Sequence, residues 1–180
     1  IQRAPDSMAK AKYAAMRERS VGLGVMGFHS YLQANMIPWE SVMAKVWNNR
    51  IFSHIKEQVD HASHVLAEER GACPDAAECG MQERFSNKTA IAPTASISII
   101  CGGASPGIEP IAGNSFTHKT LSGSFNVRNR HLARLLDEKG RNDDDTWSSI
   151  VTSGGSVMHL DFLTDEEKAV FKTAFEIDQR

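Results

Sequence analysis

The sequence predicts a mixed α/β fold, because it contains one long helical pattern and several short apolar runs that end in turns. Over residues 39–70, apolar side chains recur every three or four positions, which is the spacing of an amphipathic helix. Residues 89–92 form an apolar run that stops at Pro93, which cannot donate a ladder hydrogen bond and so ends a buried strand. Residues 115–129 alternate polar with β-forming side chains, and we expect irregular extended structure there, interrupted by Gly123.

The composition is that of a globular chain. Its 180 residues are 41% hydrophobic and 23% charged, which is enough to build a core. The net charge of -2 provides no general attraction for nucleic acid, and no apolar run approaches the length of a membrane helix. We therefore expect neither nucleic acid nor a membrane as a partner. The odd number of cysteines, three, suits a reducing compartment, and we expect a cytoplasmic protein.

The cysteines and histidines do not predict a metal site. Cys73 and Cys79 lack the spacing of zinc ligands and are expected to be ordinary thiols. His61 and His64 are three positions apart on the predicted long helix, but no third ligand accompanies them. We expect these histidines to face solvent or to be hydrogen bonded.

A glycine-rich segment near the start of the chain resembles a dinucleotide-binding fingerprint only in its spacing. Residues 22–27 fit G-x-G-x-x-G, but the fingerprint requires a buried strand before it, and a charged segment precedes this one. The better interpretation is a short strand that passes close to its neighbours before a helix over residues 28–34. An alanine- and lysine-rich helix is expected earlier, over residues 9–17.

The second half of the chain predicts several short helices. Residues 73–85 read as a connecting loop, and helices are expected over residues 131–139 and 147–151. A capping box at Thr164 predicts a last helix, with apolar residues at helical spacing as far as Phe175. Because the chain opens without methionine and stops in this predicted helix, we expect both ends to be truncated.

The stretch with the clearest chemical meaning follows Pro93. A helix start is predicted there, and Thr94, Ser96 and Ser98 place hydroxyls beside its unpaired N–H groups, where the helix dipole favours an anion such as phosphate. The spacing is not that of a Walker A loop, and no lysine lies between residues 90 and 116. Any phosphate would therefore depend on N–H groups and hydroxyls, although Thr94 or Ser96 alone would also suit a simple helix cap.

Glycines soon end this predicted helix. Residues 102 and 103 are glycines, and residues 107–110 set a second turn that can close back towards the first. Residues 92–96, 107–110 and 117–125 together strongly resemble the large subunit of ribonucleotide reductase. Residues 19–28 and 69–74 resemble, in the same order, that family's glycine segment and the close of its long helix. Motifs that recur in order are more specific than any one of them.

The resemblance implies a fold for the whole chain. It implies part of the ten-stranded α/β barrel of ribonucleotide reductase, from the C-terminal portion of the barrel and incomplete in this chain. Residues 1–180 are then one segment of the barrel domain. The complete large subunit would include the remainder of the barrel, would be an allosteric, nucleotide-binding enzyme and would form a homo-oligomer.

The resemblance also implies an activity and a substrate site. The family reduces ribonucleotides to deoxyribonucleotides for DNA synthesis by radical chemistry, with a thioredoxin- or glutaredoxin-type reductant. In that family, one segment holds the substrate diphosphate at a helix N-terminus. The residues of this chain that match it, and that we carry over as substrate-binding, are Pro93, Thr94, Ala95, Ser96 and Ile97. Ser98 is a weaker candidate.

No catalytic residue is assigned. The family forms its thiyl radical on a cysteine in an Asn-x-Cys-x-Glu loop, and neither Cys73, Cys79 nor Cys101 lies in such a setting. The isoleucines before Cys101 favour a packing role for it. A carboxylate beside a diphosphate would repel it, so Glu109 is expected to serve a turn or packing role.

The source of the radical is expected outside this segment. Residues 117–125 favour the class of reductase that works with a separate, metal-containing small subunit that generates the radical. An adenosylcobalamin-dependent reductase is the alternative within the family. Outside the enzymes, the alternative is a non-catalytic module that binds an anion or assembles through apolar surfaces.

Overall fold

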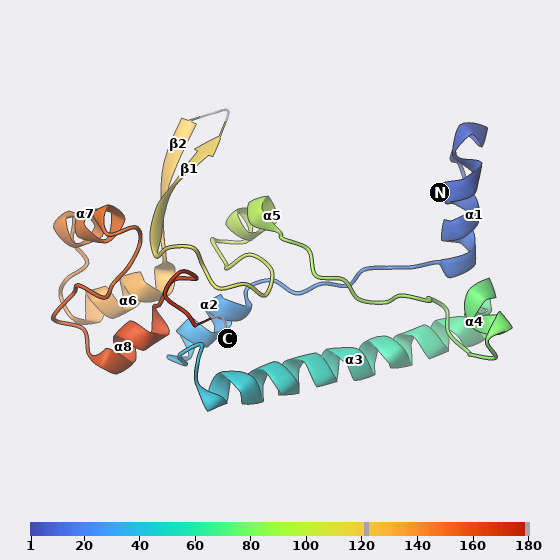
Figure 1. Ribbon diagram of the computed structural model, residues 1–180, viewed down its shortest axis with the longest axis horizontal. Coiled ribbons are helices and arrows are strands. Elements are labelled where there is room, and N and C mark those ends of the chain that lie inside the picture. Colours follow the sequence, from blue (N-terminus) through green and yellow to red (C-terminus); the bar gives the residue numbers. More distant parts are fainter. Residues whose placement is uncertain (121–122, 179–180) are drawn as a thin grey trace. The chain divides into compact units, whose positions relative to one another are not determined.

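The computed structural model describes residues 1–120 and 123–178, and the chain forms two compact units (Figure 1). The first contains Ile1–Gly24 and Asn48–Ile91, and the second contains Val25–Trp47 and Ala92–Arg180. Within the described residues, no helix is both long enough and apolar enough to cross a membrane.

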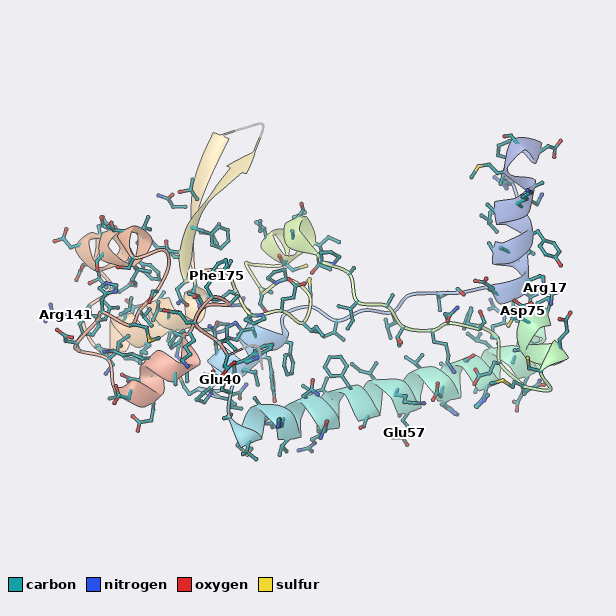
Figure 2. All side chains as sticks on the ribbon, in the orientation of Figure 1. Arg17, Glu40, Glu57, Asp75, Arg141 and Phe175 are labelled. Atoms are coloured by element: carbon teal, nitrogen blue, oxygen red, sulfur yellow. The ribbon has the colours of Figure 1, made fainter. Side chains whose placement is uncertain are left out.

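The first unit joins its short helices through one arginine. Its elements are the 3-10 helix η1 (Asp6–Met8), α1 (Ala9–Glu18), most of α3 (Val42–Arg70) and α4 (Pro74–Glu78). Arg17 of α1 donates to Asp75 of α4 at 2.6 Å (Figure 2). It also donates to Glu78 of α4 at 2.5 Å. The prediction of a loop over residues 73–85 is therefore wrong in part. Pro74 occupies the first helical position, where its missing N–H has no cost.

Helix α3 begins at Val42, instead of at residue 39 as predicted, and it ends at Arg70 as predicted. The hydroxyl of Ser41 accepts the N–H of Ala44 at 3.1 Å, which is the usual bond of a helix cap. Gly71 follows with a φ of 80°, a conformation that stops the helix and that glycine adopts without strain. The predicted apolar stripe is only partly buried, and Met43 is 51% exposed.

The predicted strand over residues 89–92 forms only one parallel bridge, between Leu23 and Thr89. Beside it, the N–H of Ala90 donates to the Leu23 carbonyl at 3.1 Å. A side chain at Gly22 would place its Cβ 3.0 Å from the Cβ of Ala90. This close approach confirms the prediction that the glycine segment passes close to a neighbouring segment of the same chain. It also explains why residue 22 has no side chain.

The second unit contains the sheet and the remaining helices. Its elements are α2 (Phe28–Ala34), α5 (Ala95–Ile100), β1 (Ser115–Thr120), β2 (Gly123–Arg128), α6 (Arg130–Glu138), α7 (Asp144–Thr152) and α8 (Asp165–Val170). Strands β1 and β2 pair antiparallel in one register, from Ser115 opposite Arg128 to Thr120 opposite Gly123. The expected extended structure is confirmed, but the expectation that it is irregular was wrong, because the two strands pair in a regular hairpin and Gly123 is paired with Thr120.

The core of the second unit lies among α6, α7, α8 and the chain between them. The buried apolar side chains of this cluster are Leu132, Leu135, Leu136, Trp147, Ile150, Val157, Leu160, Leu163, Val170 and Phe171. The indole N–H of Trp147 donates to Asn142 at 2.6 Å, so its polar edge is satisfied while the ring is buried. The capping box predicted at Thr164 is confirmed, since its hydroxyl accepts the N–H of Glu167 at 3.2 Å.

The last helix is shorter than predicted. It ends at Val170, although the apolar spacing continues to Phe175, whose side chain is 86% exposed. The N–H of Ala174 donates to the carbonyl of Ile111 at 2.8 Å, and the carboxylate of Glu176 accepts the N–H of residue 173 at 2.7 Å. These two bonds use N–H groups that a continuing helix would need, so the chain turns instead.

Candidate functional site

The predicted site is the turn into helix α5. Thr94 has a left-handed conformation, with φ 48° and ψ 28°, and it makes no side-chain cap to the helix. Within the part of the chain that the structure describes, no acceptor is found for the backbone N–H groups of Ala95, Ser96 and Ile97. All three residues are exposed. The turn therefore presents a set of unpaired donors at the positive end of a helix.

The hydroxyl of Thr94 has a structural partner. Its Oγ1 accepts the N–H of Gly107 at 2.8 Å, so the second turn closes back onto the first as the sequence predicted. Gly107 has a φ of 50°, a value that L side chains rarely adopt. Thr94 thus fixes the turn with its side chain.

Ser98 is not available in the same way as Ser96. Its side chain is 3% exposed, and its hydroxyl donates to the carbonyl of Ala95 at 3.0 Å. It therefore stabilises the first turn of α5 from the inside. The weaker candidacy of Ser98 as a substrate ligand is not supported by this position, whereas Ser96 is exposed.

The cysteines have different surroundings. Cys73 is buried, while Cys79 and Cys101 are exposed, and all three thiols are free. Cys101 follows the end of α5 and is exposed, and the side chain of Ile100 before it is 84% exposed. The packing role expected for Cys101 was therefore wrong for the described residues. Glu109 is also exposed, in the turn that follows Gly107.

The histidines singled out in the sequence lie on the surface of α3. His61 and His64 are exposed, and Nε2 of His64 lies 3.1 Å from a carboxylate oxygen of Glu83. Among residues 1–120 and 123–178, no three His, Cys, Asp or Glu side chains gather closely enough to hold a metal ion.

A charged cluster in the first unit holds the segment that leads towards the turn. The ammonium of Lys88 lies 2.6 Å from Asp60 and 3.0 Å from Glu83. Hydrogen bonds from Lys56 and then Lys88 lower the pKa of Asp60 to about 2. The cluster fastens residues 83–88 to helix α3, which is a structural role.

His29 is a buried histidine of the second unit that the sequence did not predict. His29 is 0% exposed, and its Nδ1 accepts the N–H of Ile111 at 3.0 Å. Burial lowers the pKa of His29 to about 4, so the ring is neutral at physiological pH. Its ring packs edge-on to Trp39 with centroids 5.3 Å apart. No local motif marks this residue, since its partner lies 82 positions away.

The segment at residues 117–125 is described only in part. Its backbone forms most of the β hairpin, while Leu121 and Ser122 lie outside the described residues, as do the side chains of residues 118–125. The preference for a particular class of reductase, which was based on this segment, stays a prediction.

Comparison with known proteins identifies the family. The sequence profile described as "Ribonucleotide reductase, barrel domain" matches residues 1–83 and 76–180. The chain belongs to the ribonucleotide reductase family. It is 44% identical over 182 residues to the ribonucleoside-diphosphate reductase large subunit of Invertebrate iridescent virus 3, which covers 99% of the chain and 29% of that relative. It is 35% identical over 168 residues to the vitamin B12-dependent ribonucleoside-diphosphate reductase of Mycobacterium tuberculosis strain H37Rv, which covers 91% of the chain and 24% of that relative.

A solved reductase confirms the fold. The class Id ribonucleotide reductase alpha subunit of Actinobacillus ureae superposes with a TM-score of 0.84 at 40% identity, over 95% of the chain and 31% of that subunit. The predicted family and fold class are thus confirmed. The described residues contain a two-stranded sheet and do not close a barrel. The chain spans less than a third of the length of these relatives.

Proposed function

We propose that this chain is part of the catalytic barrel of a ribonucleoside-diphosphate reductase large subunit and that it supplies the binding turn for the substrate diphosphate. Membership of the reductase family supports the activity. The observation that carries the local role is the set of exposed, unpaired N–H groups at Ala95, Ser96 and Ile97. A diphosphate carries the oxygen acceptors and the negative charge that such a set favours.

Each residue of the turn has a distinct role in this proposal. Pro93 ends the extended segment, and Thr94 holds the turn through Gly107. Ala95 and Ile97 contribute backbone N–H groups, and Ser96 adds a hydroxyl to its own N–H. The five residues carried over as substrate-binding are thus retained, with Thr94 acting mainly through its side-chain bond to Gly107.

Removing the hydroxyls of the turn tests the proposal. In the complete reductase, replacing Thr94 and Ser96 together by alanine should weaken substrate diphosphate binding by about 1 to 3 kcal/mol, since the Ser96 bond to a charged group is lost and the turn loses the bond between Thr94 and Gly107. The measurement is the KM and the dissociation constant of the ribonucleoside diphosphate. Ser53→Ala on the exposed side of α3 is the matched control. An unchanged substrate constant in the double variant would rule out this binding turn.

We also propose that the radical comes from a separate, metal-containing small subunit. Three viral relatives named as large subunits share 41% to 44% identity with this chain, and the class Id alpha subunit shares 40%, against 35% for the vitamin B12-dependent relatives. Large subunits of Danio rerio and Cryptosporidium parvum share 27% and 29%, so the support for this class comes from the viral relatives and the class Id structure. Turnover with a purified small subunit and no cobalamin is the expected result. Turnover that requires adenosylcobalamin would instead assign the alternative class.

The remaining proposals concern assembly and location. We propose that residues 1–180 act as one segment of the barrel domain, completed by the remainder of the large subunit, and that the complete subunit is a homo-oligomer under allosteric control. Large apolar side chains exposed to solvent support completion of the segment by further protein, among them Ile97 at 55% and Ile100 at 84% exposed. The three free thiols support a cytoplasmic location.

A further inference from the structure

The second unit contains a cavity of about 230 Å³ lined by residues of helix α2, helix α5 and the base of the β hairpin. Figure 1 labels these three elements. Its walls are mainly apolar, and they include Ile99, Pro106, Ile111, Phe116 and Val127. The cavity is larger than the roughly 150 Å³ that suffices to bind benzene in an apolar protein interior, and smaller than the pockets that hold drug-sized ligands. It fits a single ring with a substituent.

A buried amide in the wall has a free donor. Gln33 lines the cavity and is 1% exposed. Its Oε1 accepts from Nδ2 of Asn129 at 3.0 Å, whereas its Nε2 has no partner among the described residues. A buried amide N–H₂ without an acceptor is rare in folded proteins, because the lost hydrogen bonds to water are not replaced.

The direction of the Gln33 amide is fixed by backbone groups. Oδ1 of Asn129 accepts the N–H of His131 at 3.0 Å, so its Nδ2 must be the donor. Asn114 donates its Nδ2 to the carbonyls of Gly155 and Phe171, so its Oδ1 must accept from Asn129, at 2.8 Å. Oε1 of Gln33 is therefore the acceptor for Asn129, and exchanging the two ends of its amide would set two N–H₂ groups against each other.

The other polar groups of the wall are engaged within the protein. Arg128 lines the cavity, but its guanidinium donates to Asp144 at 2.8 Å. The hydroxyl oxygen of Ser30 accepts the N–H of Ser105 at 2.8 Å. The hydroxyl of Ser98 donates to a backbone carbonyl. The wall thus combines an unsatisfied neutral donor with apolar surface, and it has no unpaired cation for an anionic ligand.

We propose that this cavity is a binding site for a small, neutral, cyclic molecule that has an apolar body and one carbonyl oxygen, with that oxygen accepting from Nε2 of Gln33. The body would pack against the apolar wall, and the carbonyl would supply the acceptor that the fold lacks. The cavity adjoins the substrate turn, because Ala95 lines it. Binding in the cavity depends on Gln33 and the apolar wall, and it does not rest on diphosphate binding by the N–H groups of Ala95 to Ile97.

The test compares two ring compounds of nearly the same shape on the complete reductase that contains this chain. Cyclohexanone has the carbonyl, and methylenecyclohexane replaces its oxygen by a CH₂ group. Binding is followed by saturation-transfer NMR titration. Gln33→Met removes the donor at similar length, Ala112→Phe fills the cavity from an exposed wall position, and Gln58→Met on the exposed side of α3 is the matched control.

We expect cyclohexanone to bind more tightly than methylenecyclohexane by about fivefold, the effect of one hydrogen bond. Gln33→Met should remove that difference while leaving methylenecyclohexane binding in place, and Ala112→Phe should abolish binding of both. The proposal is overturned if neither compound binds, if Gln33→Met leaves the preference intact, or if Ala112→Phe leaves binding unchanged. Thermal unfolding of each variant shows that it is folded, and retained affinity for methylenecyclohexane shows that the cavity persists in Gln33→Met.

Discussion

At the scale of single residues, Thr94 has the most specific position. It is one of the few residues other than glycine with a positive φ, and its side chain bonds to the backbone of Gly107. A left-handed conformation costs an L residue roughly 1 to 2 kcal/mol, so the bond to Gly107 offsets strain at the place where substrate is proposed to bind. Strain of this kind is common at functional sites.

Substitutions at Thr94 separate its positioning role from direct contact. Thr94→Ser keeps the hydroxyl and should leave the KM of the ribonucleoside diphosphate near its original value. Thr94→Ala loses the bond to Gly107 and should raise KM several-fold and lower stability by about 1 kcal/mol. Steady-state kinetics and thermal unfolding of both variants check this. Equal effects of the two substitutions would show that the hydroxyl does not hold the turn.

The buried ring of His29 predicts a pH-dependent stability. Its pKa is lowered to about 4 in the folded state, so between this value and the ordinary pKa of 6.5 the unfolded chain binds a proton that the folded chain does not. Stability should therefore fall as the pH drops through this range, by up to about 3 kcal/mol. Denaturant unfolding from about pH 7 to pH 5 measures the slope. It should flatten in His29→Gln and persist in the exposed control His54→Gln.

At the scale of elements, the local signals were reliable. Gly71 stops α3, and the capping box at Thr164 starts α8, as the sequence predicted. These signals act within a few residues, so they are visible in the sequence. The end of α8 depends on the bond from Ala174 to Ile111, and no local pattern reveals it. The paired hairpin was likewise missed, because its register depends on both strands.

The capping box gives a prediction for helix α8. Thr164→Ala leaves the N–H of Glu167 without its acceptor and should lower the free energy of unfolding by about 1 kcal/mol. Thr152→Ala, at the exposed end of α7, is the control and should have a smaller effect. Chemical denaturation compares the two variants. A smaller loss in Thr164→Ala than in the control would contradict the role of the cap.

At the scale of the whole molecule, the family and the turn were predictable, while the long-range polar contacts were not. The motifs at residues 92–96, 107–110 and 117–125, with those at residues 19–28 and 69–74 in the same order, indicated a reductase, and the family comparison confirms it. The amide contact of Gln33 with Asn129 joins residues 96 positions apart, and nothing in either local sequence pairs them. Such contacts depend on the folded arrangement of the elements.

Residues 1–180 produced alone should have no reductase activity and should self-associate. Apolar side chains are exposed, including Phe175 at 86%, and the only sheet in the described residues is a two-stranded hairpin with both edges unpaired (Figure 2). Light scattering coupled to size exclusion, with a ribonucleotide reduction assay, checks both expectations. A monodisperse and active preparation would contradict them.

Diphosphate binding at the turn before α5 is tested by a crystal structure of the complete reductase with a bound ribonucleoside diphosphate. We expect phosphate oxygens at about 3 Å from the backbone nitrogens of Ala95, Ser96 and Ile97. We also expect the hydroxyl of Thr94 still to accept the N–H of Gly107 in that structure. A diphosphate bound elsewhere, or those nitrogens bonded to carbonyls from the rest of the protein, would contradict the proposed binding turn.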